Sequence, residues 1–158
     1  MQSMDFDKLY QDNFLKVQQF CQKWTDDVDD AKDIAQESFI GLMRREKDGD
    51  LLVNSLSWVY RVAYNRCINR YKYRKRFVYN PVNDFNISYS YDEGLNRERL
   101  VRVRKAMQRL NHKERALVTL YKMGFSYRDM AEVVGMNPTS VGKTLTRAID
   151  KLAKWVVH

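Results

Sequence analysis

The stretch from residue 126 to 154 most restricts what this chain can fold into, because it predicts two helices around a tight turn. Ser126 can cap the first helix. Gly135 permits the left-handed backbone with which many helices end. Asn137 and Pro138 form a second start signal, a side-chain cap followed by a residue suited to the first helical position. Together these signals predict a helix-turn-helix.

The second helix of this stretch has an apolar side and a polar side. Its expected buried residues are Val141, Leu145, Ala148, Ile149 and Leu152. The opposite side carries hydroxyls and cations from Ser140, Lys143, Thr144, Arg147, Lys151 and Lys154. A helix that reads the major groove offers such groups, which favours DNA binding. The alternative is a helical hairpin whose basic side is only solvated.

Composition indicates a soluble, mostly helical protein of one or two small domains. The 158 residues are 44% hydrophobic, and only six Gly and two Pro interrupt them. No apolar run approaches the roughly 18 residues of a membrane span. The acidic, polar N-terminus does not resemble a signal peptide. We therefore expect a cytoplasmic protein without membrane insertion.

The cysteines and histidines give no sign of a metal or cofactor. Cys21 and Cys67 stand alone inside helical patterns, so we expect reduced core thiols rather than a disulfide. His112 and His158 have no neighbours at metal-ligand spacing. The expectation is that no metal and no cofactor is bound.

Charge is divided unevenly along the chain. Residues 1–60 hold 7 Lys+Arg and 12 Asp+Glu, a net charge of −5, whereas residues 61–158 hold 21 and 8, a net charge of +13. A strongly basic segment attracts a polyanion such as nucleic acid. The acidic first part needs another explanation.

Residues 5–24 and about 30–45 predict two amphipathic helices. Asp30, Asp33 and Glu37 crowd the start of the second helix, where carboxylates favour the helix dipole. With Gln36 they could instead form an acidic docking face for a basic partner.

Residues 55–76 predict a helix dense in aromatic and basic residues. Its outer side carries Arg61, Asn65, Asn69, Lys72 and Arg76, widened by Arg66, Arg70, Tyr73 and Arg74. Residues 61–76 contain seven Lys+Arg and no acid. Tyrosines among arginines are typical of proteins that stack on unpaired bases. An anionic membrane surface is the alternative, although Asn65 and Asn69 suit it poorly.

Residues 77–94 show no sustained period and predict a linker, which is long for a loop inside one compact domain. A further helix is expected over 95–110, with Leu100, Val103, Met107 and Leu110 inward. Asn111 and Glu114 form a cap pair before the next helix. The predicted fold is all-α: helical domains over 1–76 and 95–158, the second with four helices including the helix-turn-helix.

Three segments together resemble one known family. Residues 30–39, DAKDIAQESF, resemble a signature in region 2 of sigma-70-type RNA polymerase sigma factors. Residues 58–65, WVYRVAYN, with the basic run 71–76, resemble a second stretch of that region. The segment GFSYRDMA at 124–131 and the helix after it resemble region 4. With only these two regions and a short linker, the resemblance is to the extracytoplasmic-function (ECF) subfamily, over nearly the whole chain.

The resemblance implies a role for each segment. Core-polymerase binding, to a coiled coil of the β′ subunit, falls on Asp30, Asp33, Gln36, Glu37 and Phe39. Recognition of the promoter −10 element falls on Trp58, Arg61, Asn65, Arg66, Asn69, Arg70, Tyr73, Arg74 and Arg76. Recognition of the −35 element falls on Ser140, Lys143, Thr144 and Arg147.

The implied partners are core RNA polymerase, through β′ and β, promoter DNA, and an anti-sigma factor, often membrane-anchored in this subfamily. The linker would thread through the polymerase. Gly142 and Thr144 stand where many members carry Lys and Arg, so the −35 preference does not transfer. No enzyme is expected, since the sequence offers no nucleophile–base pair or phosphate loop. The alternatives are a free-standing helix-turn-helix regulator and, less favoured, a nucleic-acid enzyme.

Overall fold

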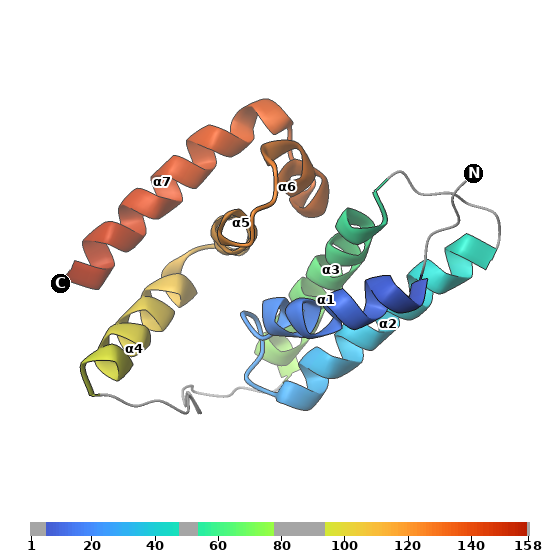
Figure 1. Cartoon of the computed structure of the whole chain (residues 1–158). Coiled ribbons are helices and arrows are strands. Elements are labelled where there is room, and N and C mark those ends of the chain that lie inside the picture. The colour runs from blue at the N-terminus through green and yellow to red at the C-terminus, as the bar shows by residue number, and fades with distance from the viewer. Residues whose placement is uncertain (1–5, 48–53, 78–93, 158) are drawn as a thin grey trace. The chain divides into compact units, whose positions relative to one another are not determined.

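The computed structural model describes residues 6–47, 54–77 and 94–157, and these residues form helices and short connections with no strand among them (Figure 1). The elements are α1 (Phe6–Cys21), α2 (Val28–Lys47), α3 (Ser55–Phe77), α4 (Gly94–Arg109), α5 (His112–Lys122), α6 (Tyr127–Val134) and α7 (Pro138–Val157). The predicted all-α fold is confirmed.

The chain divides into two compact units, residues 1–81 and 82–158. The first contains α1 to α3 and the second contains α4 to α7. Helix α3 ends at Phe77 and α4 begins at Gly94, and residues 78–93 of the predicted linker lie outside the described residues. The functional assignment of the two domains stays a prediction.

The first unit is a three-helix bundle in which each helix packs on the other two. Aromatic rings from all three helices meet in its core. Phe20 of α1 meets Tyr60 of α3 edge to face with ring centroids 5.2 Å apart. Phe39 of α2 makes a similar contact with Tyr10 of α1 at 5.2 Å. Such ring pairs add to the burial of apolar area that holds the helices together.

Cys21 and Cys67 are buried free thiols, as expected from the sequence. The Cys67 thiol donates to the backbone carbonyl oxygen of Cys21 at 4.0 Å, a contact that joins α3 to α1. The hydrogen bond with Cys21 and burial both raise the pKa of the Cys67 thiol. Burial likewise raises the pKa of the Tyr60 phenol, and the nearby Cys21 adds to that effect.

The second unit begins its helices at the predicted caps. Asn111 accepts a hydrogen bond from the Glu114 amide at 2.8 Å, and the Glu114 carboxylate accepts one from the Asn111 amide at 3.1 Å. Asn137 accepts from the Thr139 amide at 3.0 Å, ahead of Pro138 as the first residue of α7. These caps satisfy amides that would otherwise lack partners at the helix starts.

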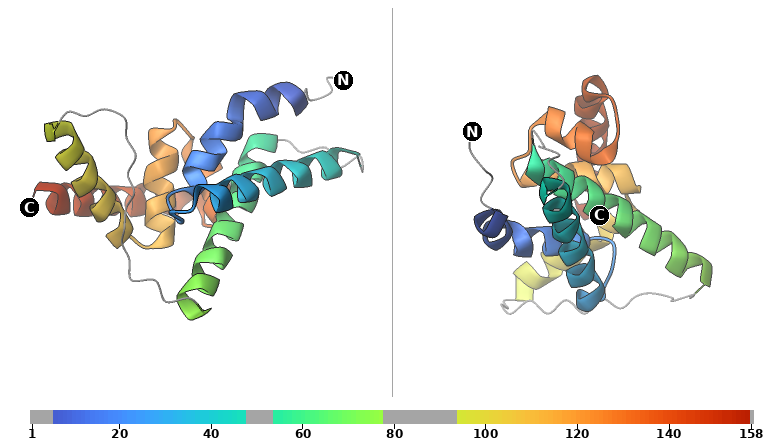
Figure 2. Two further views of the ribbon diagram at one scale, coloured as in Figure 1. Left: turned by 90° about the horizontal axis from the view of Figure 1, so that it is seen from below. Right: turned by 90° about the vertical axis from the view of Figure 1, so that its right-hand side faces the viewer.

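Arg115 ties α4 to α5 from a buried position, only 6% exposed. Its guanidinium donates to the carbonyl oxygens of Met107, Gln108 and Leu110 at 3.1, 3.1 and 3.3 Å. Met107 and Gln108 lie in the last turn of α4, and Leu110 follows it. Carbonyls at a helix end lack the usual amide partner four residues on, and the Met107 carbonyl also accepts from the Leu110 amide at 3.2 Å. In the left view of Figure 2, α4 passes across the carboxyl-terminal part of α7, against which it packs.

Two predicted core residues of this unit are exposed instead. Val103 of α4 is 37% exposed and Ile149 of α7 is 40% exposed. On α4, Ala106 and Leu110 are buried. Helix α4 packs mainly on α7, so its buried stripe is narrower than the apolar pattern predicts. Ile149 lies at the edge of the α7 stripe centred on Val141, Leu145 and Ala148.

Candidate functional site

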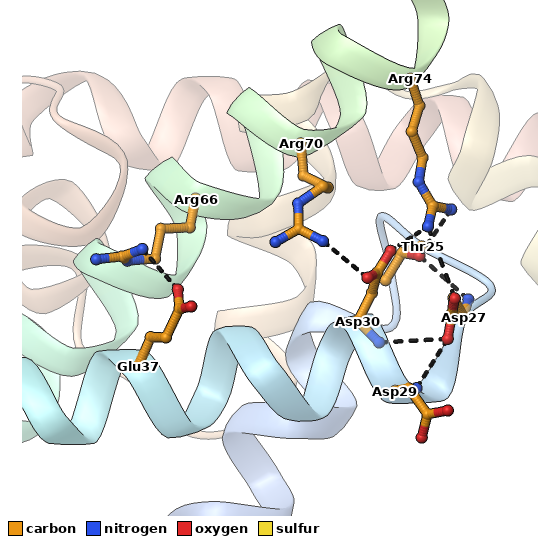
Figure 3. A network of polar contacts seen from close by, with 8 residues as sticks. All are labelled: Thr25, Asp27, Asp29, Asp30, Glu37, Arg66, Arg70 and Arg74. Carbon is orange, nitrogen blue, oxygen red and sulfur yellow. Dashed lines mark hydrogen bonds and ion pairs between the residues drawn. The ribbon is translucent and has the colours of Figure 1, made fainter. Parts of the chain in front are cut away.

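Acidic residues in the first half of α2 pair with arginines of α3. Glu37 accepts a hydrogen bond from Arg66 at 2.7 Å. Asp30 accepts one from Arg70 at 2.7 Å and another from Arg74. Figure 3 shows the three arginines in a row along α3, each directed toward α2. We call these five side chains the ion-pair ladder.

Helical spacing explains the ladder. Arg66, Arg70 and Arg74 are four residues apart, so they share one side of α3. Asp30 and Glu37 are seven residues apart, which places them on one side of α2, two turns from each other. The start of α2 is fixed by Asp27, which accepts from the Asp29 amide at 2.9 Å.

The ladder divides the predicted basic side of α3 into two stripes. The inner stripe is Arg66, Arg70 and Arg74, with side chains between 38% and 49% exposed. The outer stripe, which we define by its exposed residues, is Arg61, Asn65, Asn69, Lys72 and Tyr73. Sequence alone could not separate them, because the division depends on where α2 crosses. The side chain of Arg76 lies outside the described residues.

Trp58, predicted to touch −10 DNA, packs against α2. The ring lies so close to Gly41 that a β-carbon there would be 3.1 Å from Trp58 Cη2. The guanidinium of Arg45 sits over the ring, 5.4 Å from its centroid. Trp58 remains partly exposed. Its main contacts therefore fix α2 to α3.

The predicted polymerase-binding residues of α2 are only partly on the surface. Asp33 and Glu37 are exposed and Gln36 is partly exposed. Phe39 is 1% exposed and lies in the aromatic core, so its side chain cannot form a surface contact in this structure. Ile40 is 41% exposed on the same side as Asp33 and Glu37. The sequence could have indicated that Ile40 is exposed, because Ile40 lies outside the apolar stripe of α2.

The second unit contains the predicted helix-turn-helix in α6 and α7. Ser126 accepts from the Asp129 amide at 3.1 Å, and Gly135 ends α6 with φ of +72°. The two helices pack through buried residues, namely Met130, Ala131, Val133, Val134, Val141, Leu145 and Ala148. Turn and caps thus hold α7 firmly against α6.

The predicted −35 residues lie together on α7. Ser140, Lys143 and Arg147 are exposed, and Thr144 is partly exposed. Lys151 continues this stripe in the sequence, but its ammonium pairs with the Glu114 carboxylate of α5 at 2.5 Å. The predicted −35 residues therefore all lie in the amino-terminal half of α7.

The described residues show neither a cluster suited to a metal ion nor a helix suited to a membrane span. In the ranges that the structure describes, no group of three or more His, Cys, Asp or Glu side chains is arranged to hold a metal ion. None of the described helices is both long enough and apolar enough to cross a membrane.

Comparison with known families agrees with this geometry in both units. Sigma-70 region 2 matches residues 9–77, which hold the ion-pair ladder and the outer stripe. Sigma-70 region 4 matches residues 100–152, which hold the helix-turn-helix. The chain belongs to the sigma-70 family. It is a sigma factor of the ECF subfamily, as the sequence resemblance predicted.

Curated relatives are similar over most of this sigma factor. The ECF RNA polymerase sigma factor SigM of Mycobacterium tuberculosis is 25% identical over 150 residues, covering 94% of this chain and 76% of the relative. RNA polymerase sigma factor YlaC of Bacillus subtilis is 23% identical, covering 92% of this chain and 88% of the relative.

Solved structures show the same fold. RpoE, in complex with the anti-sigma factor NepR from Bartonella quintana, is 19% identical with a TM-score of 0.73, covering 96% of each chain. CnrH, in complex with the cytosolic domain of CnrY, is 20% identical with a TM-score of 0.67, covering 94% of this chain and 85% of the other. The sigma-70 family comprises transcription initiation factors, which are not classed as enzymes.

Proposed function

We propose that this ECF sigma factor directs promoter-specific transcription initiation through three surfaces, each of which binds one macromolecular target. The exposed side of α2 binds core RNA polymerase. The outer stripe of α3 binds the −10 element, and the amino-terminal half of α7 binds the −35 element. The supporting observation is that the exposed carboxylates of Asp33 and Glu37 share one side of α2, whereas exposed cations, amides and hydroxyls gather on the outer stripe of α3 and on the amino-terminal half of α7.

The polymerase surface is Asp33, Gln36, Glu37 and Ile40. Two carboxylates with an exposed aliphatic residue one turn after Glu37 suit a basic helical partner, such as a coiled coil of β′. Glu37 pairs with Arg66 while about half exposed. Exposed ion pairs contribute only about 0–1 kcal/mol, so a polymerase cation can replace Arg66 at little cost. We assign Phe39 a packing role instead.

The −10 surface is the outer stripe of α3, with Tyr73 as its aromatic group, 59% exposed. Aromatic stacking returns roughly 1–3 kcal/mol per unpaired base, which offsets part of the cost of opening the duplex. Arg61 and Lys72 supply phosphate contacts. Arg66, Arg70 and Arg74 serve first to hold α3 on α2 and reach DNA only from the edge of the stripe.

An anti-sigma factor is a further proposed partner. Support comes from the two structural neighbours, RpoE bound to NepR and CnrH bound to the cytosolic domain of CnrY. We propose that such a factor blocks the polymerase surface of α2 until it is released. We also propose that the protein acts in the cytoplasm and performs no catalysis of its own.

The polymerase surface is tested by charge reversal. Asp33→Lys with Glu37→Lys should abolish or strongly reduce capture of core polymerase by the tagged full chain. Asp7→Lys with Asp12→Lys is the matched control, since it makes the same charge change at exposed positions of α1. Equal core binding by both double variants would show that α2 is not the docking surface.

A further inference from the structure

We propose that Tyr127 contacts a phosphate of the −35 DNA, and that Gly142 positions the tyrosine ring by leaving space for it against α7. We call this space at Gly142 the seat of the ring. The inference rests on the proposed role of α7 in −35 recognition. It also explains why a glycine stands in the middle of a recognition helix, where an alanine would favour the helix more.

The ring of Tyr127 lies directly on the backbone of α7. A β-carbon built on Gly142 would be 3.2 Å from Tyr127 Cε2 and 3.9 Å from Cδ2. The first distance is closer than side chains normally approach, so any larger residue at 142 would push the ring away. Gly142 thus leaves room for the ring of Tyr127 against α7.

Tyr127 is held in place from its own helix as well. It is the first residue of α6, and the cap formed by Ser126 fixes that helix end. Even so, Tyr127 is 46% exposed. A tyrosine with one ring edge seated on a helix and almost half of its surface in solvent presents a rigid group to a partner.

The location suits a DNA backbone contact. In a helix-turn-helix the first helix crosses the backbone while the amino-terminal part of the second enters the major groove. Tyr127 opens the first helix and touches the fifth residue of the second. Its neighbours Arg128 and Lys143 are exposed cations. Tyrosine hydroxyls are among the groups that donate hydrogen bonds to phosphate oxygens.

Phenylalanine separates this role from simple packing. Tyr127→Phe keeps the ring against Gly142 and removes only the hydroxyl. The probe is a labelled promoter duplex selected from a random library with wild-type holoenzyme, that is, this chain bound to core polymerase. We expect about tenfold weaker binding, the effect of one hydrogen bond to a charged group. Tyr121→Phe is the matched control, because Tyr121 is 52% exposed on α5.

The salt dependence adds a second readout. A tyrosine hydroxyl is neutral and releases no counterion, so Tyr127→Phe should leave the slope of log K against log [salt] unchanged. Lys143→Ala should lower that slope by about one. The loss in Tyr127→Phe should also be similar for −35 variants of different sequence, as expected for a backbone contact.

Gly142→Ala tests the seat. In the wild-type background the added methyl displaces the ring, and we expect about threefold weaker binding without a lower thermal midpoint, since alanine favours the helix. In a Tyr127→Ala background the same change should have no effect. This double-mutant cycle isolates the coupling between the two positions.

The outcomes separate the inference from the proposed function. Wild-type binding by Tyr127→Phe, with weaker binding by Lys143→Ala and Arg147→Ala, would overturn the Tyr127 contact and leave −35 recognition by α7 intact. Wild-type binding by all of these variants would contradict both. Equal effects of Gly142→Ala on DNA binding in the two backgrounds would show that Gly142 does not position the ring of Tyr127.

Discussion

Asp30 of α2 and Arg70 of α3, forty residues apart in the chain, are joined by a hydrogen bond of 2.7 Å in an ion pair whose carboxylate side is only 16% exposed. Asp30 also pairs with Arg74. The sequence resemblance implies that Asp30 contacts the polymerase. In the structure, Asp30 also holds α3 against α2 inside the first unit. Variants of Asp30 should therefore change the stability of the first unit.

Asp30→Asn is expected to destabilise the first unit. It removes the charge that two guanidinium groups share, at a helix start where the dipole already disfavours cations. Because both arginines reach solvent, we expect a loss of about 1–2 kcal/mol, below that of a fully buried pair. Thermal unfolding measures it as a drop of several degrees. Asp33→Asn, at an exposed position, is the control and should shift the midpoint little.

The two stripes of α3 are expected to respond differently to alanine. Arg61→Ala should weaken open-complex formation and reduce its salt dependence, with an unchanged thermal midpoint, because Arg61 is exposed on the outer stripe. Arg70→Ala should lower the thermal midpoint, because Arg70 holds Asp30. Potassium permanganate footprinting reports promoter opening. The reverse pattern would show that the inner stripe is the DNA surface.

Arg115→Met is expected to destabilise the second unit by about 2–4 kcal/mol. The change keeps an unbranched chain but removes the buried guanidinium that donates to three carbonyls at and just after the end of α4. Denaturant unfolding of the full chain measures the loss in the second unit. Arg102→Ala, an exposed arginine of α4, is the control and should change stability by less than about 0.5 kcal/mol. Similar losses of stability in both variants would show that the hydrogen bonds of Arg115 do not stabilise the second unit.

Alkaline pH is expected to weaken the first unit. The pKa values of Cys67 and Tyr60 are raised in the folded state, so the native protein keeps protons that the unfolded chain releases. The Cys67 contribution is complete below the ordinary thiol pKa of about 8.5, and the Tyr60 contribution is complete below the ordinary tyrosine pKa of about 10. Above its own ordinary pKa, each group loses up to about 1.4 kcal/mol of stability per pH unit. Thermal unfolding between pH 7 and 10.5 measures the fall. Cys67→Ala should flatten the fall above about pH 8.5, and Tyr60→Phe should flatten only the part above about pH 10. A decline in Cys67→Ala as steep as in the wild type would contradict the assignment.

Local signals in the sequence predicted local structure well. The caps at Asn111, Ser126 and Asn137 and the left-handed Gly135 depend on residues within one turn of each helix end. These caps could be predicted without knowledge of the tertiary fold. The helix pattern and the two reduced thiols followed from the same short-range information.

Contacts between helices could not be read in this way. The pairing of Arg66 with Glu37 depends on how α2 and α3 cross, so the sequence showed one broad basic side where the structure has two stripes. The contact of Tyr127 with Gly142 likewise joins two helices. Val103 was wrongly predicted to be inward, because apolar character alone does not say how wide a packed stripe is.

Run-off transcription with purified core polymerase tests the central claim most directly. Core enzyme plus this chain should start transcripts at a defined promoter selected from a genomic library, whereas core enzyme alone should not. The chain without core enzyme should bind the same duplex far more weakly. Tight binding of the free chain to that duplex, with no new transcript in the presence of core enzyme, would instead show a free-standing helix-turn-helix regulator and contradict the account.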